Sequence, residues 1–183
     1  MSGVAGPGDV LDFWADAGPD RWWRQDPAFD AAIAARFGDL HRRAADGACD
    51  DWEMQSPDAA LALVIVLDQF SRNLHRGSAL AYAADPKALA LVHRLMARGA
   101  DRRMRADIGS FVYMPLMHSE TLADQELSVR ETARIEGPEA VASAQQHRDI
   151  IARFGRFPHR NAVLGRVSTP AEIAFLREGG FAG

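Results

Sequence analysis

Proline at the start of successive segments is the feature that most constrains how this chain can fold. Asp26-Pro27, Ser56-Pro57, Asp85-Pro86 and Thr169-Pro170 each place an N-capping side chain directly before a proline. Proline is favoured at the first helical position, and a capping oxygen satisfies backbone N–H groups there, so each pair predicts a helix start. Glycines after several apolar runs are typical helix ends. The pattern predicts a chain built from helices.

Apolar residues recur at helical spacing along the chain. Phe29, Ile33, Phe37 and Leu40 follow the first of these starts, whereas strand-like alternation is scarce. The starts, stops and spacing together predict helices over about 10–16, 27–46, 57–75, 86–98, 120–135, 138–154 and from 170 onward. Because the loops between them are short, neighbouring helices should be antiparallel and form a compact array.

Length and composition limit the class of protein. We expect a single helical domain over residues 1–183, with residues 1–8 flexible. No apolar run approaches the roughly 18 residues of a membrane span, and the N-terminus lacks the basic and apolar parts of a signal peptide. The single cysteine, Cys49, leaves no internal disulfide. These features favour a cytoplasmic protein with no membrane partner.

The overall charge argues against one class of partner and draws attention to one segment. The formal net charge is −4, whereas sequence-independent nucleic-acid binding rests on neutralising phosphates, so no nucleic-acid partner is expected. Residues 153–161 nevertheless gather three arginines, a histidine and an asparagine around two phenylalanines. Arginine suits carboxylate and phosphate oxygens. Since 20 of the 21 basic residues are arginine, position and clustering carry this argument rather than residue identity.

The helix predicted from Pro57 is apolar on nearly all sides as far as Leu67, which predicts a central position, and it also carries a charged stripe. At about 100° per residue, Asp68, Arg72 and Arg76 continue an aliphatic line, so one face changes from apolar to charged along its length. A carboxylate four positions before a cation is the favourable order for a helical pair. One interpretation is a structural Asp68–Arg72 pair that crosses from core to rim. The other is that Asp68 orients Arg72 or Arg76 toward an anionic ligand.

His147 is a candidate on the helix predicted from Pro138. It shares an apolar face with Ile151, and this face leads directly into the cationic segment 153–161. A histidine in such a position is either a hydrogen-bonded core residue or a ligand contact. The sequence leaves both interpretations open.

The segment around His118 has a similar ambiguity. Pro115 should break or kink the preceding helix, which places His118 and Ser119 at the start of the next one. Ser119 would then be an N-cap with Glu120 in the first turn, where a carboxylate complements the helix dipole. Alternatively, His118 and Glu120 form a proton-transfer pair, although a two-residue spacing does not put them on one helical face.

Other kinds of site have weak support. The chain has no His-x-x-x-His or His-Glu-x-x-His motif, so we expect no metal. It has no Gly-x-Ser-x-Gly motif and no glycine-rich phosphate loop, and no cofactor is expected. Trp22 and Trp23 either pack in the core or line a ligand groove.

Five segments, taken in order, resemble a known family: residues 10–14, 67–77, 113–120, 153–161 and 164–169. From about Val10 to Phe181 the chain resembles a widespread, mostly bacterial family known only as a domain of unknown function. The resemblance implies an all-helical fold similar to tetratricopeptide-repeat proteins, that is, a compact array of antiparallel helical hairpins. It implies no activity, so it assigns no site residue.

Three hypotheses remain open. The first is a polar pocket for a small anionic ligand, lined by Asp68, Arg72, Arg76, His147, Arg156, Arg160 and Asn161, with His118, Glu120 and His159 as candidates for catalysis. The second is a protein-interaction module whose groove clamps an acidic peptide; a closed pocket would favour the small molecule and an open groove the peptide. The third is a buried ionic network that fixes helix packing. Whether the protein is an enzyme, and its oligomeric state, stay open.

Overall fold

The computed structural model describes residues 5–181. Over that range the chain forms α-helices, a π-helical segment, 3-10 helices and turns, with no strand, which confirms the predicted all-α class. The tetratricopeptide-like arrangement stays a prediction. Residues 1–4, part of the segment expected to be flexible, lie outside the described residues, and the first helix begins at Pro7.

The longer α-helices follow the predicted segments closely, whereas three four-residue helices, Pro19–Trp22, Trp52–Gln55 and Met114–Met117, were not predicted. Their bounds in chain order are α1 Pro7–Ala17, α2 Pro19–Trp22, α3 Pro27–Ala45, α4 Trp52–Gln55, α5 Pro57–Ile65, α6 Ser71–Leu74, α7 Asp85–Ala97, α8 Met114–Met117, α9 Leu122–Ile135, α10 Pro138–Phe154 and α11 Pro170–Arg177. The short 3-10 helices are Ala79–Tyr82, Asp101–Arg103, Gly109–Tyr113 and Pro158–Arg160.

Capping side chains fix the start of two long segments, as the sequence predicted. The Asp26 carboxylate accepts hydrogen bonds from the N–H groups of Ala28 and Phe29 at 2.9 and 3.1 Å. The Ser56 hydroxyl accepts one from Ala59 N–H at 3.0 Å. These bonds satisfy N–H groups that have no partner within the helix, so the capping residues set where α3 and α5 begin.

The described chain divides into two compact units. Unit 1 comprises residues 5–76 and 80–115, and unit 2 comprises residues 77–79 and 116–181. The expectation of a single domain, which rested on chain length, stays a prediction.

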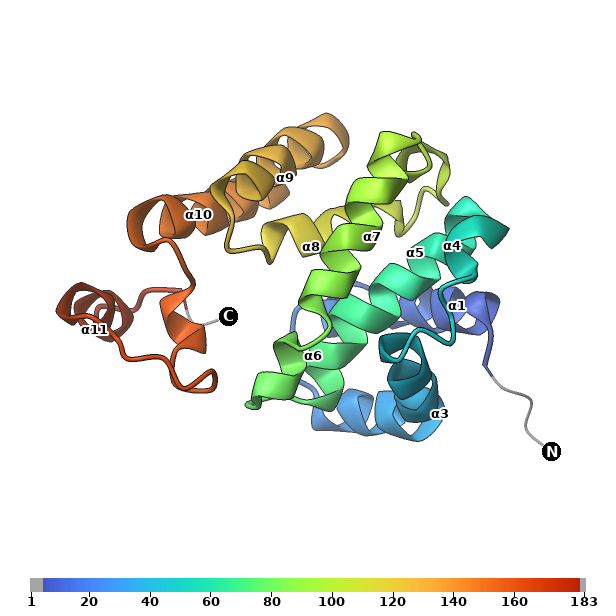
Figure 1. The fold of residues 1–183 in the computed structure, drawn as a ribbon, viewed down its shortest axis with the longest axis horizontal. Helices are drawn as coiled ribbons and strands as arrows, with labels where there is room; N and C mark the ends of the chain where they lie inside the picture. Colours follow the sequence, from blue (N-terminus) through green and yellow to red (C-terminus); the bar gives the residue numbers. More distant parts are fainter. Residues whose placement is uncertain (1–4, 182–183) are drawn as a thin grey trace. The chain divides into compact units, whose positions relative to one another are not determined.

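Unit 1 is built around α5, and every residue from Ala59 to Phe70 is buried. Helix α5 contacts α1, α4, α7 and the 3-10 helix Gly109–Tyr113, while α3 packs against α6 (Figure 1). This confirms the central position that the apolar sequence predicted. Trp14, 1% exposed, and Phe37, fully buried, pack edge-on or tilted against the ring of Phe70, so aromatic contacts join α1 and α3 to this core.

A π-helical segment, Val66–Phe70, connects α5 to α6. A π turn holds more residues than an α turn, so the side chains after it are rotated relative to a straight α-helix. The charged side chains predicted on this face therefore do not follow one straight line along the helix. Their exposure to solvent nevertheless still rises along the chain. Asp68 is fully buried, Arg72 is half-buried and Arg76 is exposed.

Unit 2 contains the antiparallel hairpin of α9 and α10, followed by α11 (Figure 1). Gly155, with φ of 69°, ends α10, and its N–H bonds the carbonyl of Ile151 at 2.8 Å. Such a left-handed residue is the usual helix terminator. The apolar centre of this unit is formed by Ile150, Ile151 and Phe157, with Phe154, Phe175 and Phe181 packed partly buried against them.

Candidate functional site

In unit 1, Arg72 is held by two carboxylates. Its guanidinium donates to both oxygens of Asp85 at 3.0 Å, and to the Asp68 carboxylate and carbonyl at 3.2 and 2.7 Å. The ring of Tyr82 lies 5.6 Å from the guanidinium carbon. Burial by itself would lower the pKa of Arg72, but the charges of Asp68 and Asp85 outweigh it and raise the pKa. Arg72 therefore forms the pair with Asp68 that the structural interpretation predicted, and it also pairs with Asp85.

Arg76 is also ion-paired within unit 1. Its guanidinium makes two parallel bonds of 2.9 Å to the carboxylate of Asp30, which also accepts from the Asn73 amide at 2.7 Å. Burial tends to raise the pKa of Asp30, yet the Arg76 and Asn73 hydrogen bonds bring the net pKa down. This pair joins α3 to the segment after α6.

In unit 2, several predicted residues gather around the fully buried ring of Phe157. The rings of His147 and His159 lie 5.7 and 5.6 Å from it, and the Arg160 guanidinium lies over its face at 4.4 Å. Phe181 contacts both histidine rings. We call these five residues the Phe157 cluster. The continuity that the sequence suggested between α10 and residues 153–161 is present here.

Both histidines of the Phe157 cluster are held neutral near pH 7. His147 Nδ1 lies 2.8 Å from the Ser143 carbonyl, so this nitrogen donates its proton and Nε2 keeps a lone pair. Burial lowers the pKa of His147, although the bond to Ser143 partly opposes the shift. Burial, followed by the charges of Arg160 and His147, lowers the pKa of His159 to about 4. Within the described residues, the buried His159 Nδ1 has no hydrogen-bond partner.

Glu120 has a structural role in this unit. Its Oε1 accepts from the N–H of Phe157 at 2.9 Å and from the Arg166 guanidinium at 2.8 Å. Burial tends to raise the pKa of Glu120, but these bonds and the charge of Arg166 lower it. The carboxylate therefore stays ionised, which disfavours its use as a general acid. The carbonyl of His118 accepts from Arg160 at 3.1 Å.

The structure corrects the predicted helix start at this segment. Helix α9 begins at Leu122 with Thr121 as its N-cap, so His118 and Ser119 do not lie at its first turn. The Ser119 hydroxyl instead accepts from Thr121 N–H at 3.1 Å and donates to the Asp124 carboxylate at 2.7 Å. A turn closed by Ser119 thus delays the helix by two residues, because the serine oxygen competes for the N–H groups that would begin it.

Arg156 and Asn161 are engaged with the segment that leads into α11. Arg156 donates to both oxygens of Glu172 at 2.6 and 2.8 Å and to the Val167 carbonyl at 2.8 Å. The bond from Arg156 is the main reason that the pKa of Glu172 is lowered to about 2. The Asn161 amide donates to the Ser168 hydroxyl at 3.0 Å. These contacts fix α11, so Arg156 has little capacity left for a ligand.

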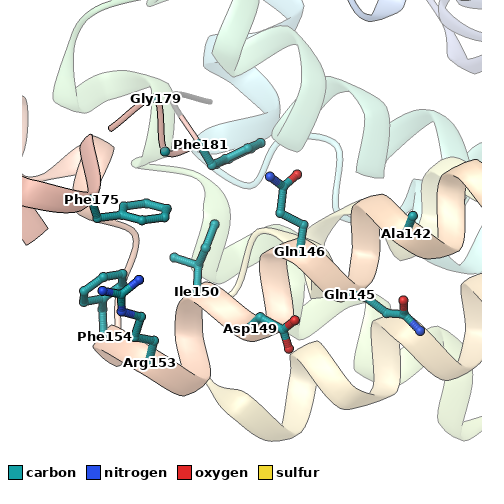
Figure 2. Close-up of a pocket in the computed structure, with 11 residues that line it drawn as sticks. Ala142, Gln145, Gln146, Asp149, Ile150, Arg153, Phe154, Phe175, Gly179 and Phe181 are labelled. Carbon is teal, nitrogen blue, oxygen red and sulfur yellow. The ribbon is translucent and has the colours of Figure 1, made fainter. Parts of the chain in front are cut away.

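An open groove lies on the outer face of α10, and we call it the α10 groove. Its volume is about 410 Å³. Figure 2 shows its floor and rim, formed by Ala142, Gln145, Gln146, Asp149, Ile150, Arg153, Phe154, Phe175 and Gly179 to Phe181. The Arg153 guanidinium lies 4.6 Å from the Phe154 ring and 5.7 Å from the Phe175 ring. A second hollow of about 480 Å³ shares Arg153 and Phe154 and extends to Arg156 and Glu172.

The predicted binding residues do not line the α10 groove, so sequence reasoning missed it. Gln145, Asp149 and Arg153 recur every four positions on α10. That spacing marks a polar stripe on one helix face, away from the face of His147, and this signal was available in the sequence. The contribution of Phe175 and Phe181 had no comparable signal, because it depends on how the chain returns after α11.

Two findings concern other kinds of site. Among residues 5–181, no helix combines the length and apolarity required to cross a bilayer. In the same part of the chain, no three histidine, cysteine, aspartate or glutamate side chains gather in a way that could hold a metal ion.

Comparisons with known proteins place the chain in a family. Residues 10–180 match the family described as "Bacterial protein of unknown function (DUF924)". A solved protein of unknown function from Agrobacterium tumefaciens is 42% identical, with a TM-score of 0.90 over 94% of this chain and 97% of its own. No curated protein matches the chain. The resemblance inferred from the sequence is confirmed, and the chain belongs to the bacterial DUF924 family of unknown function.

Proposed function

We propose that unit 2 is a protein-interaction module whose α10 groove binds an acidic peptide segment carrying a large apolar side chain. The single observation that supports this proposal most is the pairing of an aromatic floor with an exposed, uncompensated arginine in an open groove. The proposal assigns no reaction to the protein.

The shape of the α10 groove favours a peptide side chain. Ile150, Phe154 and Phe175 provide an apolar floor, and a volume of about 410 Å³ is ample for one aromatic side chain. The groove is open to solvent, whereas small-molecule sites enclose most of their ligand. Burying one aromatic ring of a partner would supply about 1.5–3 kcal/mol.

The charge of the groove favours an acidic partner. Asp149, the acidic residue of the rim, is already paired with Arg148 at 2.6 Å. Within the described part of the chain, the Arg153 guanidinium lies over two aromatic rings and forms no ion pair. A carboxylate of the partner can therefore pair with Arg153 without breaking an existing salt bridge. The protein's net charge of −4 makes this local cation a selective feature.

A fluorescence-polarisation titration tests this proposal. The probe is a short labelled peptide with one phenylalanine among aspartates and glutamates, compared with peptides that lack the ring or carry amides instead of carboxylates. We expect Arg153→Glu to weaken binding about tenfold, because it replaces an attraction by a repulsion. Arg130→Glu, an exposed arginine of α9 outside the groove, is the matched control and should bind as wild type. Equal affinity for all three peptides would refute the proposal.

A small anionic ligand is the second candidate function, and His159 is the observation that favours it. Its Nδ1 is buried with no hydrogen-bond partner among the described residues, beside the cation of Arg160. In this version Arg160 holds the anion and His159 or His118 moves protons. Titrating phosphate and simple carboxylates while recording the melting temperature tests it. Identical shifts for the wild-type protein, Arg160→Ala and His159→Gln would contradict a site at this place.

A further inference from the structure

The second hollow of unit 2 adjoins the α10 groove, and we call it the Arg156 hollow. Its volume is about 480 Å³, and the residues that line it are Arg153, Phe154, Arg156, Thr169, Ala171 and Glu172. Arg153 and Phe154 line the α10 groove as well, at the end of the groove where α10 ends (Figure 2). A peptide that pairs with Arg153 from the groove therefore also reaches the Arg156 hollow.

The two hollows offer different amounts of apolar surface. Large apolar side chains line much of the α10 groove: Ile150, Phe154, Phe175 and Phe181. The Arg156 hollow has the ring of Phe154 on one side and the small side chain of Ala171 on another, and its other lining residues are polar. An aromatic ring gains free energy in proportion to the apolar area it removes from water. The α10 groove is therefore the better place for a partner's ring.

The two hollows also differ in charge. The α10 groove is lined by one cation, Arg153, and one anion, Asp149, so its charges cancel. The Arg156 hollow is lined by two cations, Arg153 and Arg156, and one anion, Glu172, which leaves a charge of +1. The Asp149 side chain is 67% exposed and can repel a partner's carboxylate, whereas Glu172 is 2% exposed and both its oxygens accept from Arg156. A carboxylate is therefore attracted more strongly to the Arg156 hollow.

We infer that the Arg156 hollow is the acidic subsite of the peptide site, so that the partner's aromatic ring binds in the α10 groove and its carboxylate binds in the Arg156 hollow, paired with Arg153. This inference rests on the proposed function and adds where each group of the peptide lies. Arg153 forms no ion pair within the described residues. The carboxylate therefore pairs with an uncompensated cation and leaves the bond between Arg156 and Glu172 intact.

Helix α11 indicates how far apart the two groups lie along the peptide. Ala171 lines the Arg156 hollow and Phe175 lines the α10 groove, and four residues of an α-helix cover about 6 Å along its axis. Two residues of an extended chain cover about 6.6 Å and point their side chains to the same face. An extended peptide whose acidic residue lies two positions from its aromatic residue should therefore fill both hollows. Directly adjacent residues point to opposite faces and should fill only one.

The experiment changes the charge of each hollow separately and measures fluorescence polarisation with the full-length protein. One labelled peptide has an aspartate two positions to either side of a phenylalanine, and the other has asparagines there. The ratio of their dissociation constants reports the carboxylate contribution, and a variant that weakens both peptides equally does not change it. Ala171 is exposed and lines only the Arg156 hollow, whereas Ala142 is exposed and lines only the α10 groove.

Opposite charges at position 171 should act in opposite directions. We expect Ala171→Glu to lower the preference for the aspartate peptide about tenfold and Ala171→Lys to raise it about threefold. A glutamate in the first turn of α11 complements the helix dipole, so that variant should keep its melting temperature. Ala142→Glu should leave the preference unchanged, since about 16 Å of helix separates it from Arg153 and salt screens charges over that distance. Ala174→Glu, an exposed site of α11 outside both hollows, is the matched control.

The outcomes separate this inference from the proposed function. A preference that neither substitution of Ala171 changes, or that Ala142→Glu lowers instead, overturns the acidic subsite and keeps the α10 groove as a peptide site. Equal affinity for a peptide with its aspartates directly beside the phenylalanine also overturns the placement of ring and carboxylate in separate hollows. Absence of binding of either peptide to the wild type overturns both the inference and the proposed function.

Discussion

Arg72 shows how a single side chain can be committed to structure. Two carboxylates and a carbonyl surround its guanidinium, and Asp68 has no exposed surface. Asp68 and Asp85 are not equivalent partners, because Asp85 takes both guanidinium branches while Asp68 meets one. Arg72 thus keeps a carboxylate partner, Asp85, when Asp68 is removed.

This asymmetry predicts unequal losses of stability. Arg72→Ala should lower the free energy of unfolding by about 3–5 kcal/mol, because it removes the ion pairs with both Asp68 and Asp85. Asp68→Ala should lower it by roughly half as much, about 2 kcal/mol, because Arg72 keeps Asp85. Urea unfolding measures both. Arg42→Ala removes an exposed pair with Asp39 and should stay within about 1 kcal/mol of wild type. A larger loss for Asp68→Ala than for Arg72→Ala would contradict this account.

Individual helices differ in how tightly their glycines are constrained. Gly38 lies inside α3, and an added Cβ there meets nothing within 4 Å. Gly180 closes the end of α11, where an added Cβ would collide with backbone. The same substitution should therefore have opposite effects on the two elements.

We expect Gly38→Ala to raise the free energy of unfolding by about 0.5–1 kcal/mol, because alanine loses less backbone entropy in a helix. Gly180→Ala should loosen the end of α11 and speed amide exchange at position 180, whose N–H bonds the Phe175 carbonyl in the wild type. Urea unfolding and hydrogen exchange measure the two effects. Unchanged exchange at position 180 would show that the turn tolerates a side chain.

At the scale of the whole molecule, buried histidines and paired carboxylates act in the same direction with pH. Burial lowers the pKa of His41, with a further contribution from His75, and also lowers that of His147 and His159. The unfolded chain, with histidine pKa values near 6.5, therefore binds more protons than the folded one below that pH. Stability is fully present above about pH 6.5 and falls as the pH drops toward the folded-state values.

The expected acid sensitivity can be assigned to one residue. For His159, a pKa of about 4 instead of 6.5 corresponds to a loss on the order of 3 kcal/mol between those pH values. Urea unfolding from pH 7.5 to pH 4.5 should show a steep decline in the wild type and a shallower one in His159→Gln. Below about pH 4.5, Glu172 adds a decline of the same sign, because its pKa is also lowered. Parallel curves for the two proteins would exclude His159 as the cause.

The amount of structure readable from the sequence depends on how local the deciding interactions are. Asp26 and Ser56 cap helices through N–H groups two or three residues away, so their pattern alone predicted α3 and α5. The uninterrupted apolar run of α5 likewise predicted its central place. Ser119 was assigned wrongly, because its hydroxyl had a competing turn partner that the capping pattern does not reveal.

The sequence by itself determined the helical class, most helix bounds, the buried α5 and the family. Which charged residues form ion pairs with one another was decided by the tertiary structure. Asp85 lies 13 residues from Arg72, Glu172 lies 16 from Arg156, and Asp30 lies 46 from Arg76. It also brought Phe175 and Phe181 beside α10 to form the groove. Helix capping and periodicity act over one or two turns and leave a mark in the sequence, whereas ion pairs and grooves depend on where distant segments come to lie.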